Sequence, residues 1–178
     1  DYINTVSPTF LNEIVNGYFP DLFTWQLREA IRVKYSLGCA CGILNAPKGI
    51  DDPSVARGLV RNYTADDVVE GKLENKIEFQ RRMGLQQNPE APIFYWPHRL
   101  YHQKGPHLVT EIALALVDHY RVEGLQIAFV ANGDQEIEKA CGTISCGSGG
   151  NIAYRRFNAG LSELGKAASD FILMPSLY

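Results

Sequence analysis

The sequence predicts an α/β fold in which helices cover both faces of a parallel β-sheet. Short apolar runs alternate with helical patterns along the chain. From residue 91 onward these runs are continuously apolar, which is typical of parallel strands buried on both faces. The length of 178 residues suffices for one large core or two small domains, and 46% hydrophobic with 21% charged residues is a globular composition.

The first 45 residues are predicted to form two strands with two helices between them. Residues 3–6 form a short strand candidate. A helix over 7–15 follows, with serine as its N-cap and proline at its first position. A second helix is predicted over 21–37, where apolar side chains recur on one face and a glycine ends the pattern. Residues 39–44 then form a short strand.

The next segment separates this part from the rest of the chain. Residues 45–58, NAPKGIDDPSVARG, are rich in proline, glycine and aspartate and lack a helical or strand period. This segment is therefore the best candidate for a linker or a functional loop. A helix is predicted over 65–83, where acidic and basic side chains are spaced to pair on a helix surface.

Strands and helices alternate regularly in the remaining residues. Their predicted order is strand 92–97, helix 106–121, strand 125–130, helix 135–141, strand 151–155, helix 160–168 and strand 171–174. This order indicates a parallel sheet whose strands are joined by right-handed crossovers.

Charge and cysteine content argue against several classes of protein. A net charge of −3 does not suit a general nucleic-acid binder, and no apolar run approaches the ~20 residues of a membrane helix. The four cysteines, Cys39, Cys41, Cys141 and Cys146, fit no standard zinc spacing. Reduced thiols in a cytoplasmic protein are the expected state, and neither a metal nor a cofactor is predicted.

A cationic stretch follows the first strand of the regular part. Residues 98–107, HRLYHQKGPH, hold three histidines, an arginine and a lysine. The next two strands end in NGD (132–134) and YRRF (154–157). Because ligands bind at the carboxyl edge of parallel sheets, where helix starts offer free N–H groups, these three loops predict a phosphate site. Arg99 can grip a phosphate with two parallel hydrogen bonds, and Lys104 adds a compact charge.

A solvated basic loop is the alternative interpretation of the same stretch. His98, His102 and His107 carry less weight than the two cations. They have no acidic partner nearby in sequence and no helical spacing that would suit a metal ion.

Several motifs, in order along nearly the whole chain, resemble one family. HRLYHQKG (98–105) looks like S-R-L-x-x-Q-K-G of the bacterial glycogen synthases and plant starch synthases. The other matching segments are VSPTF (6–10), GILN (42–45), NYTADD to FQRRMGL with KLENK between them (62–85), NGD (132–134) and ASDFILMPSLY (168–178).

The resemblance implies a retaining glucosyltransferase of the GT-B type, with two Rossmann-like domains facing across a cleft. Residues 1–45 would then end the N-terminal, acceptor-side domain, residues 46–90 would form the crossover, and 91–178 would begin the nucleotide-sugar-binding domain. The implied reaction moves glucose from ADP-glucose to the non-reducing end of an α-1,4-glucan, in the cytoplasm or, in a plant, the plastid. The family's K-x-G-G-L and E-P-C-G-L segments do not occur in these 178 residues, so we expect an internal fragment.

Five residues are carried over from the family's motifs. Arg99 and Lys104 match the pair that holds the donor's pyrophosphate. Gly133 and Asp134 match the loop beside the nucleotide, although a turn and a helix cap would explain both residues. Phe157 takes the place of an aromatic residue that stacks near the adenine, and its alternative role is core packing.

Some positions depart from the family pattern. Ala46 replaces a glycine, His98 replaces a serine, and Leu177 stands where the family has an arginine. These departures keep two alternatives open. The protein could be another retaining GT-B transferase with a different nucleotide sugar, or a non-catalytic glucan-binding paralogue. No oligomeric state is predicted.

Overall fold

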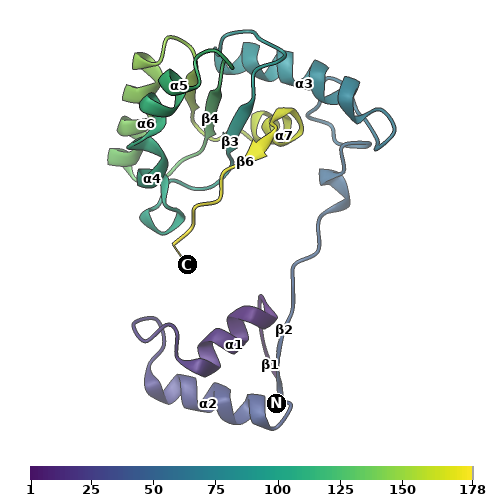
Figure 1. The fold of residues 1–178 in the computed structure, drawn as a ribbon. Coiled ribbons are helices and arrows are strands. Elements are labelled where there is room, and N and C mark those ends of the chain that lie inside the picture. Colours follow the sequence, from purple (N-terminus) through teal and green to yellow (C-terminus); the bar gives the residue numbers. More distant parts are fainter. Residues whose placement is uncertain (178) are drawn as a thin grey trace. The chain divides into compact units, whose positions relative to one another are not determined.

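The computed structural model describes residues 1–177 and divides the chain into two compact units, Asp1–Lys48 and the part that begins at Gly49 (Figure 1). The boundary between them falls inside the proline- and glycine-rich segment 45–58. Among the described residues, no helix combines the length and apolar character that a membrane span requires.

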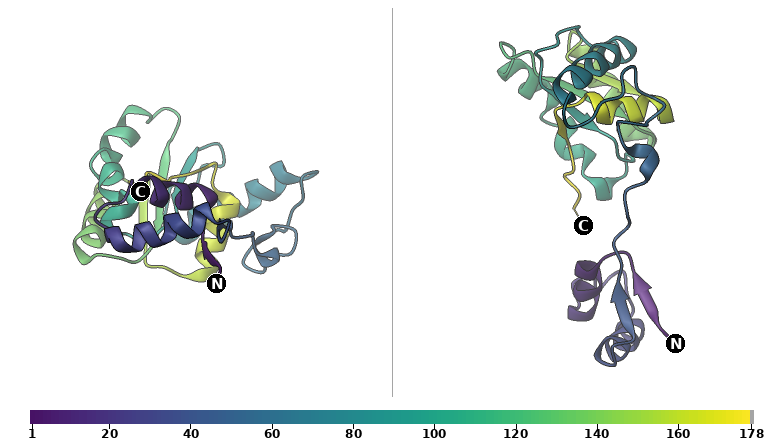
Figure 2. Two further views of the ribbon diagram at one scale, coloured as in Figure 1. Left: turned by 90° about the horizontal axis from the view of Figure 1, so that it is seen from below. Right: turned by 90° about the vertical axis from the view of Figure 1, so that its right-hand side faces the viewer.

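The first unit is a strand–helix–helix–strand motif. Its elements are β1 (Ile3–Thr5), α1 (Pro8–Asn16), α2 (Trp25–Ser36) and β2 (Ala40–Gly42). The two strands pair in parallel and lie side by side (Figure 2). Leu11 and Ile14 of α1 and Ile31 of α2 are buried together and form a small core against these strands.

Capping residues set where the two helices of this unit begin. The Phe10 N–H donates to Ser7 Oγ at 3.4 Å, so α1 begins as predicted. The prediction that the second helix begins at residue 21 was wrong. Thr24 is its N-cap and accepts from the Leu27 N–H at 3.4 Å, so residues 21–24 lie outside the helix.

The second unit holds the regular α/β part of the chain. Its elements are α3 (Val68–Met83), β3 (Ile93–Trp96), α4 (Pro106–Thr110), α5 (Ala113–His119), β4 (Gln126–Val130), α6 (Gln135–Gly147), β5 (Ile152–Arg155), α7 (Ala159–Ala168) and β6 (Phe171–Ile172). The four strands form one sheet in the order β5-β4-β3-β6, and all neighbours are parallel. The predicted parallel α/β sheet is therefore confirmed.

Three helix predictions in this unit were wrong in extent. The helix predicted over 65–83 begins at Val68. The helix predicted over 106–121 is broken into α4 and α5, and the Ile112 N–H bonds to the nearer Val109 carbonyl at the break. Three β-branched residues crowd this turn and disfavour a continuous helix. The helix predicted over 135–141 continues to residue 147 because Ile144 is buried against the sheet, which outweighs the poor propensity of Gly142 and Thr143.

Alternate residues of β3, β4 and β5 serve two separate cores, one on each face of the sheet. Phe94 and Trp96 of β3 face the core shared with α4, α5 and α6. Ile93 and Tyr95 face the core shared with α3 and α7. Figure 1 shows the two groups of helices on opposite sides of the strands. These three strands thus bury residues on both faces, as their continuous apolar runs predicted, whereas both residues of the edge strand β6 are exposed.

The polar side chains of α3 tie distant segments to the start of the sheet. Lys72 Nζ donates to the carbonyl of Ala167 at 3.1 Å and to that of Ser169 at 2.7 Å. Lys76 Nζ lies 2.8 Å from Asp170 Oδ2, and this oxygen also accepts from the Ile93 N–H at 2.8 Å. The two lysines of the KLENK motif (72–76) therefore fix the chain just before β6 against α3, and Asp170 connects it to the first residue of β3.

Candidate functional site

The carboxyl ends of β3, β4 and β5 surround a cavity of about 480 Å³. Most of its lining residues come from the three loops that the sequence singled out, and the others lie directly before those loops or in the first turn of α6. The lining residues are Pro97, His98, Arg99, Tyr101, Val130, Ala131, Asn132, Gly133, Glu138, Arg156 and Phe157. Of the five predicted site residues, Arg99, Gly133 and Phe157 line this cavity. Lys104 and Asp134 lie on the same loops but are not among the lining residues.

Backbone hydrogen bonds hold the first two loops together. The Leu100 N–H donates to the Asn132 carbonyl at 3.0 Å, and the Asp134 N–H donates to the Leu100 carbonyl at 2.9 Å. A Cβ on Gly133 would collide with the Leu100 carbonyl oxygen. Glycine is therefore required here for close backbone approach, and this approach brings Arg99 beside the 132–134 loop.

Arg99 presents its guanidinium without a carboxylate partner. Its side chain is exposed, and its Cζ lies 5.4 Å from the centre of the Tyr101 ring, which supports the flat guanidinium group. Within residues 1–177 no ion pair involves Arg99. Its charge is therefore available for an anionic ligand.

Lys104 lies in a short 3₁₀ turn, His102–Lys104, that the C-terminal segment holds in shape. Gly105 follows with a φ of +71°, a conformation that favours glycine, and a Cβ there would collide with the Pro175 carbonyl. The Leu177 N–H donates to the Gln103 carbonyl at 2.9 Å. The half-buried Lys104 side chain is close enough to His98 that its charge acts on the imidazole.

Glu138 is a lining residue that sequence reasoning missed. Its Oε1 accepts from the Gly133 N–H at 2.9 Å, and its Oε2 lies 3.3 Å from Arg156 Nη2. The Gly133 N–H is the main cause of a lowered Glu138 pKa, and Arg156 adds to the effect. A glutamate in the first turn of α6 was the only available signal, and many exposed helix starts share it.

Phe157 and Asp134 occupy different environments at this edge. The Phe157 side chain is 54% exposed, so it takes no part in the core, and its N–H donates to Asn132 Oδ1 at 3.0 Å. This contact ties the third loop to the second and leaves an aromatic surface beside the cavity. Asp134 occupies the N-cap position of α6, but its exposed side chain makes no capping hydrogen bond.

The histidines and cysteines do not form a metal cluster. His102 and His107 stack with ring centres 4.5 Å apart and planes 8° from parallel, so their nitrogens do not converge on one point. No group of three possible ligands gathers within the described residues. All four cysteines carry free thiols, and burial raises the pKa of Cys141 to about 12.

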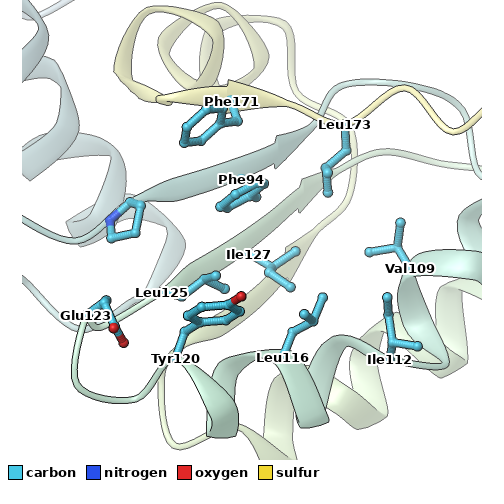
Figure 3. Close-up of a pocket in the computed structure, with 11 residues that line it drawn as sticks. Phe94, Val109, Ile112, Leu116, Tyr120, Glu123, Leu125, Ile127, Phe171 and Leu173 are labelled. Atoms are coloured by element: carbon cyan, nitrogen blue, oxygen red, sulfur yellow. The ribbon is translucent and has the colours of Figure 1, made fainter.

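A second cavity, of about 410 Å³, lies on one face of the sheet beside α4 and α5 (Figure 3). Phe94 and Phe171 stack at its wall with ring centres 4.6 Å apart, and Val109 and Leu116 face them across the cavity. Among the lining residues that the structure describes, Glu123 is the only charged one. This apolar cavity is unsuited to a phosphate, so the polar cavity at the strand ends is the candidate site.

Comparison with known proteins identifies the class of fold. The catalytic domain of starch synthase IV from Arabidopsis thaliana, bound to ADP and acarbose, matches with a TM-score of 0.77 and 23% identity. The match covers 99% of this chain and 35% of that one. The chain therefore has the α/β fold of GT-B glycosyltransferases.

Sequence similarity identifies the family. Glycogen synthase of Exiguobacterium sibiricum is 34% identical over 99% of this chain, and that of Bacillus subtilis is 32% identical over 100%. The chain belongs to the glycogen and starch synthase family, as its motifs indicated. It spans about 35% of the length of each of these two relatives. No family model matches the chain.

Proposed function

We propose that the chain is part of a glycogen or starch synthase, which transfers glucose from ADP-glucose to the non-reducing end of an α-1,4-glucan with retained configuration. The observation that carries the proposal is the similarity to bacterial glycogen synthases along the whole chain. The cavity at the strand ends supports it, because an unpaired arginine lies where parallel α/β sheets bind phosphates.

The two cations would act on the leaving group. As the glycosidic bond to the diphosphate breaks, negative charge grows on the departing oxygens. Arg99 would hold these oxygens with its planar fork, and Lys104 would add a point charge from the adjoining turn. Fixed charges aimed at the developing charge lower the barrier more than they strengthen substrate binding.

The remaining predicted residues would position the nucleotide. Gly133 and Asp134 would lie beside it, and the exposed ring of Phe157 would stack near the adenine. On the same proposal residues 1–45 end the acceptor-side domain, residues 46–90 are the crossover, and residues 91–178 begin the nucleotide-sugar-binding domain. The expected location is the cytoplasm.

The test is a donor panel assayed with the full-length parent protein and glycogen. Transfer of labelled glucose from ADP-glucose, well above transfer from UDP-glucose or GDP-glucose, is the expected result. Preference for another donor would show that the protein is a different GT-B transferase. No transfer from any donor, with glucan binding retained, would show a non-catalytic paralogue.

A further inference from the structure

His98 lines the candidate site, and Trp96 holds it in place. It follows β3 by two residues and lines the same cavity as Arg99. The Trp96 indole N–H donates to the His98 carbonyl oxygen at 2.7 Å. The two rings meet edge to face, with centres 5.9 Å apart and planes at 83°. The backbone and the ring of His98 are thus both held by Trp96.

The Nε2 nitrogen of this ring has no hydrogen-bond partner among the described residues. His98 Nε2 is buried, and no described residue makes a hydrogen bond with it. Buried polar atoms are nearly always paired, so an unpaired one beside a cavity needs an explanation. A ligand in the cavity would supply the missing partner.

The charges around the cavity indicate which ligand would do so. Arg99 is unpaired and Lys104 lies near the imidazole, whereas the Arg156 guanidinium is already paired with Glu138. Burial, followed by the Lys104 charge, lowers the His98 pKa, so the ring is neutral at neutral pH and carries one N–H group. The Gly133 N–H is taken by Glu138. An N–H group on His98 would therefore be a hydrogen-bond donor close to two cations, Arg99 and Lys104. It would be available to an anionic ligand.

We propose that His98 Nε2–H donates a hydrogen bond to an oxygen of the diphosphate that Arg99 and Lys104 hold. This inference rests on the diphosphate site of the proposed function, and it adds a third ligand to that site. The family has serine at this position, whose short side chain does not extend as far as an imidazole. The imidazole of His98 would thus reach the leaving diphosphate, which the shorter serine side chain at this position would not.

The test measures binding of inorganic pyrophosphate, ADP and adenosine to the 178-residue chain by titration calorimetry. We expect His98→Ala to weaken pyrophosphate and ADP about tenfold or more, as for loss of a hydrogen bond to a charged group, and to leave adenosine unchanged. His98→Gln keeps a donor and should retain most of the affinity. His102→Ala, in the same loop but outside the cavity lining, is the matched control.

A second measurement needs no variant. In ¹⁵N-labelled wild-type protein, the His98 Nε2 resonance should shift when pyrophosphate is added, whereas the resonances of the exposed His119 should not. An unshifted resonance at saturation would overturn the proposal, and so would unaltered pyrophosphate affinity in His98→Ala.

Pyrophosphate contains no nucleoside, so its binding tests the role of His98 independently of which nucleotide sugar is the donor. If UDP or GDP binds in place of ADP, the proposed donor is wrong, but the pyrophosphate experiments still decide the role of His98. If Arg99→Lys weakens pyrophosphate and His98→Ala does not, the diphosphate site stands and the role of His98 falls.

Discussion

Arg99 and Lys104 carry the charge on which the proposed reaction depends, and each has a substitution that removes one property. Arg99→Lys keeps the charge and deletes the fork, whereas Lys104→Met keeps the stem and deletes the charge. In the full-length parent, each change should lower kcat by roughly 10²–10³-fold, with a smaller effect on the donor KM, because the stabilised charge is largest in the transition state. Steady-state kinetics with ADP-glucose and glycogen would measure both constants.

The double variant and a neighbour provide the controls. Because both residues act on one group, Arg99→Lys combined with Lys104→Met should lose less than the product of the two effects. His102→Ala should keep near-normal turnover. If Lys104→Met alone also keeps near-normal turnover, its assignment to the diphosphate is wrong.

Glu138 should make the site loop sensitive to acid. Its folded-state pKa lies below the ordinary value of 4.5, mainly because the Gly133 N–H donates to it. A lowered pKa contributes stability that is present above the unfolded-state pKa and is lost as the pH falls through the folded-state value. Glu138→Gln should therefore lower the melting temperature at neutral pH, and the difference from wild type should shrink as the pH falls below the ordinary glutamate pKa of 4.5.

Thermal melts between neutral and acidic pH would check the effect. The matched control is Glu136→Gln, an exposed glutamate in the same helical turn. A melting-temperature difference for Glu138→Gln that stays constant down to about pH 3 would mean that its charge is not what matters.

Substitution by alanine should have different effects at two glycines, Gly133 just before α6 and Gly142 within it. At Gly133 a Cβ meets the Leu100 carbonyl, so Gly133→Ala should separate the two loops and weaken pyrophosphate binding. At Gly142 a Cβ meets nothing within 4 Å, so Gly142→Ala should stabilise the helix by about 0.5–1 kcal/mol without altering binding. Calorimetric binding and chemical denaturation together would separate the two outcomes. Unchanged pyrophosphate affinity in Gly133→Ala would contradict the close approach.

The ion pair between Lys76 of α3 and Asp170, the residue before β6, should contribute to the stability of the fold. Lys76→Met would remove the ion-pair partner of Asp170 and lower the free energy of unfolding by about 2–3 kcal/mol. This value is below the usual range for a fully buried pair because Asp170 is 30% exposed. Urea unfolding followed by Trp96 fluorescence, in a Trp25→Phe background, would measure it.

An exposed lysine tests whether the effect is specific. Lys139→Met removes a charge from the surface of α6, where no described carboxylate forms an ion pair with it, and should change stability by less than about 0.5 kcal/mol. Equal effects at the two lysines would show that the pair with Asp170 contributes nothing particular.

Local patterns predicted the elements well wherever burial follows a simple period. Each strand of the larger sheet was expected within two residues of its observed bounds, because the strands are mostly continuous apolar runs and β3 and β4 are buried on both faces. The break between α4 and α5 and the length of α6 could not be predicted in this way. In both places contacts with the sheet compete with local helix propensity, and a single sequence does not contain those contacts.

The candidate site divides in the same way. The general position of Arg99, Gly133 and Phe157 follows from the rule that parallel strands end at one edge, and the structure places all three around one cavity. The role of Glu138 and the unpaired nitrogen of His98 depend on which backbone groups are already bonded. The groups that form these bonds belong to other loops, and a local stretch of sequence does not show which loops will meet.

At the scale of the whole molecule, we expect the 178-residue chain to show no transferase activity by itself. The family's K-x-G-G-L donor loop and E-P-C-G-L segment do not occur in it, and it spans about 35% of its relatives' length. Incubation of the purified chain with ADP-glucose and glycogen should give background incorporation only. Turnover above that background would mean that the active site is misplaced here.

The hydrogen bonds from residues 173–177 to β3 and to the turn that carries Lys104 have a consequence for the order of folding. The Leu173 N–H donates to the Tyr95 carbonyl at 2.8 Å, and the Leu177 N–H donates to the Gln103 carbonyl at 2.9 Å. The turn that carries Lys104 therefore takes its shape from residues synthesised long after it. Contacts so far apart in sequence form late because a long loop must close first. We therefore expect β3, β4 and β5 to begin packing before the turn that carries Lys104 takes its final shape.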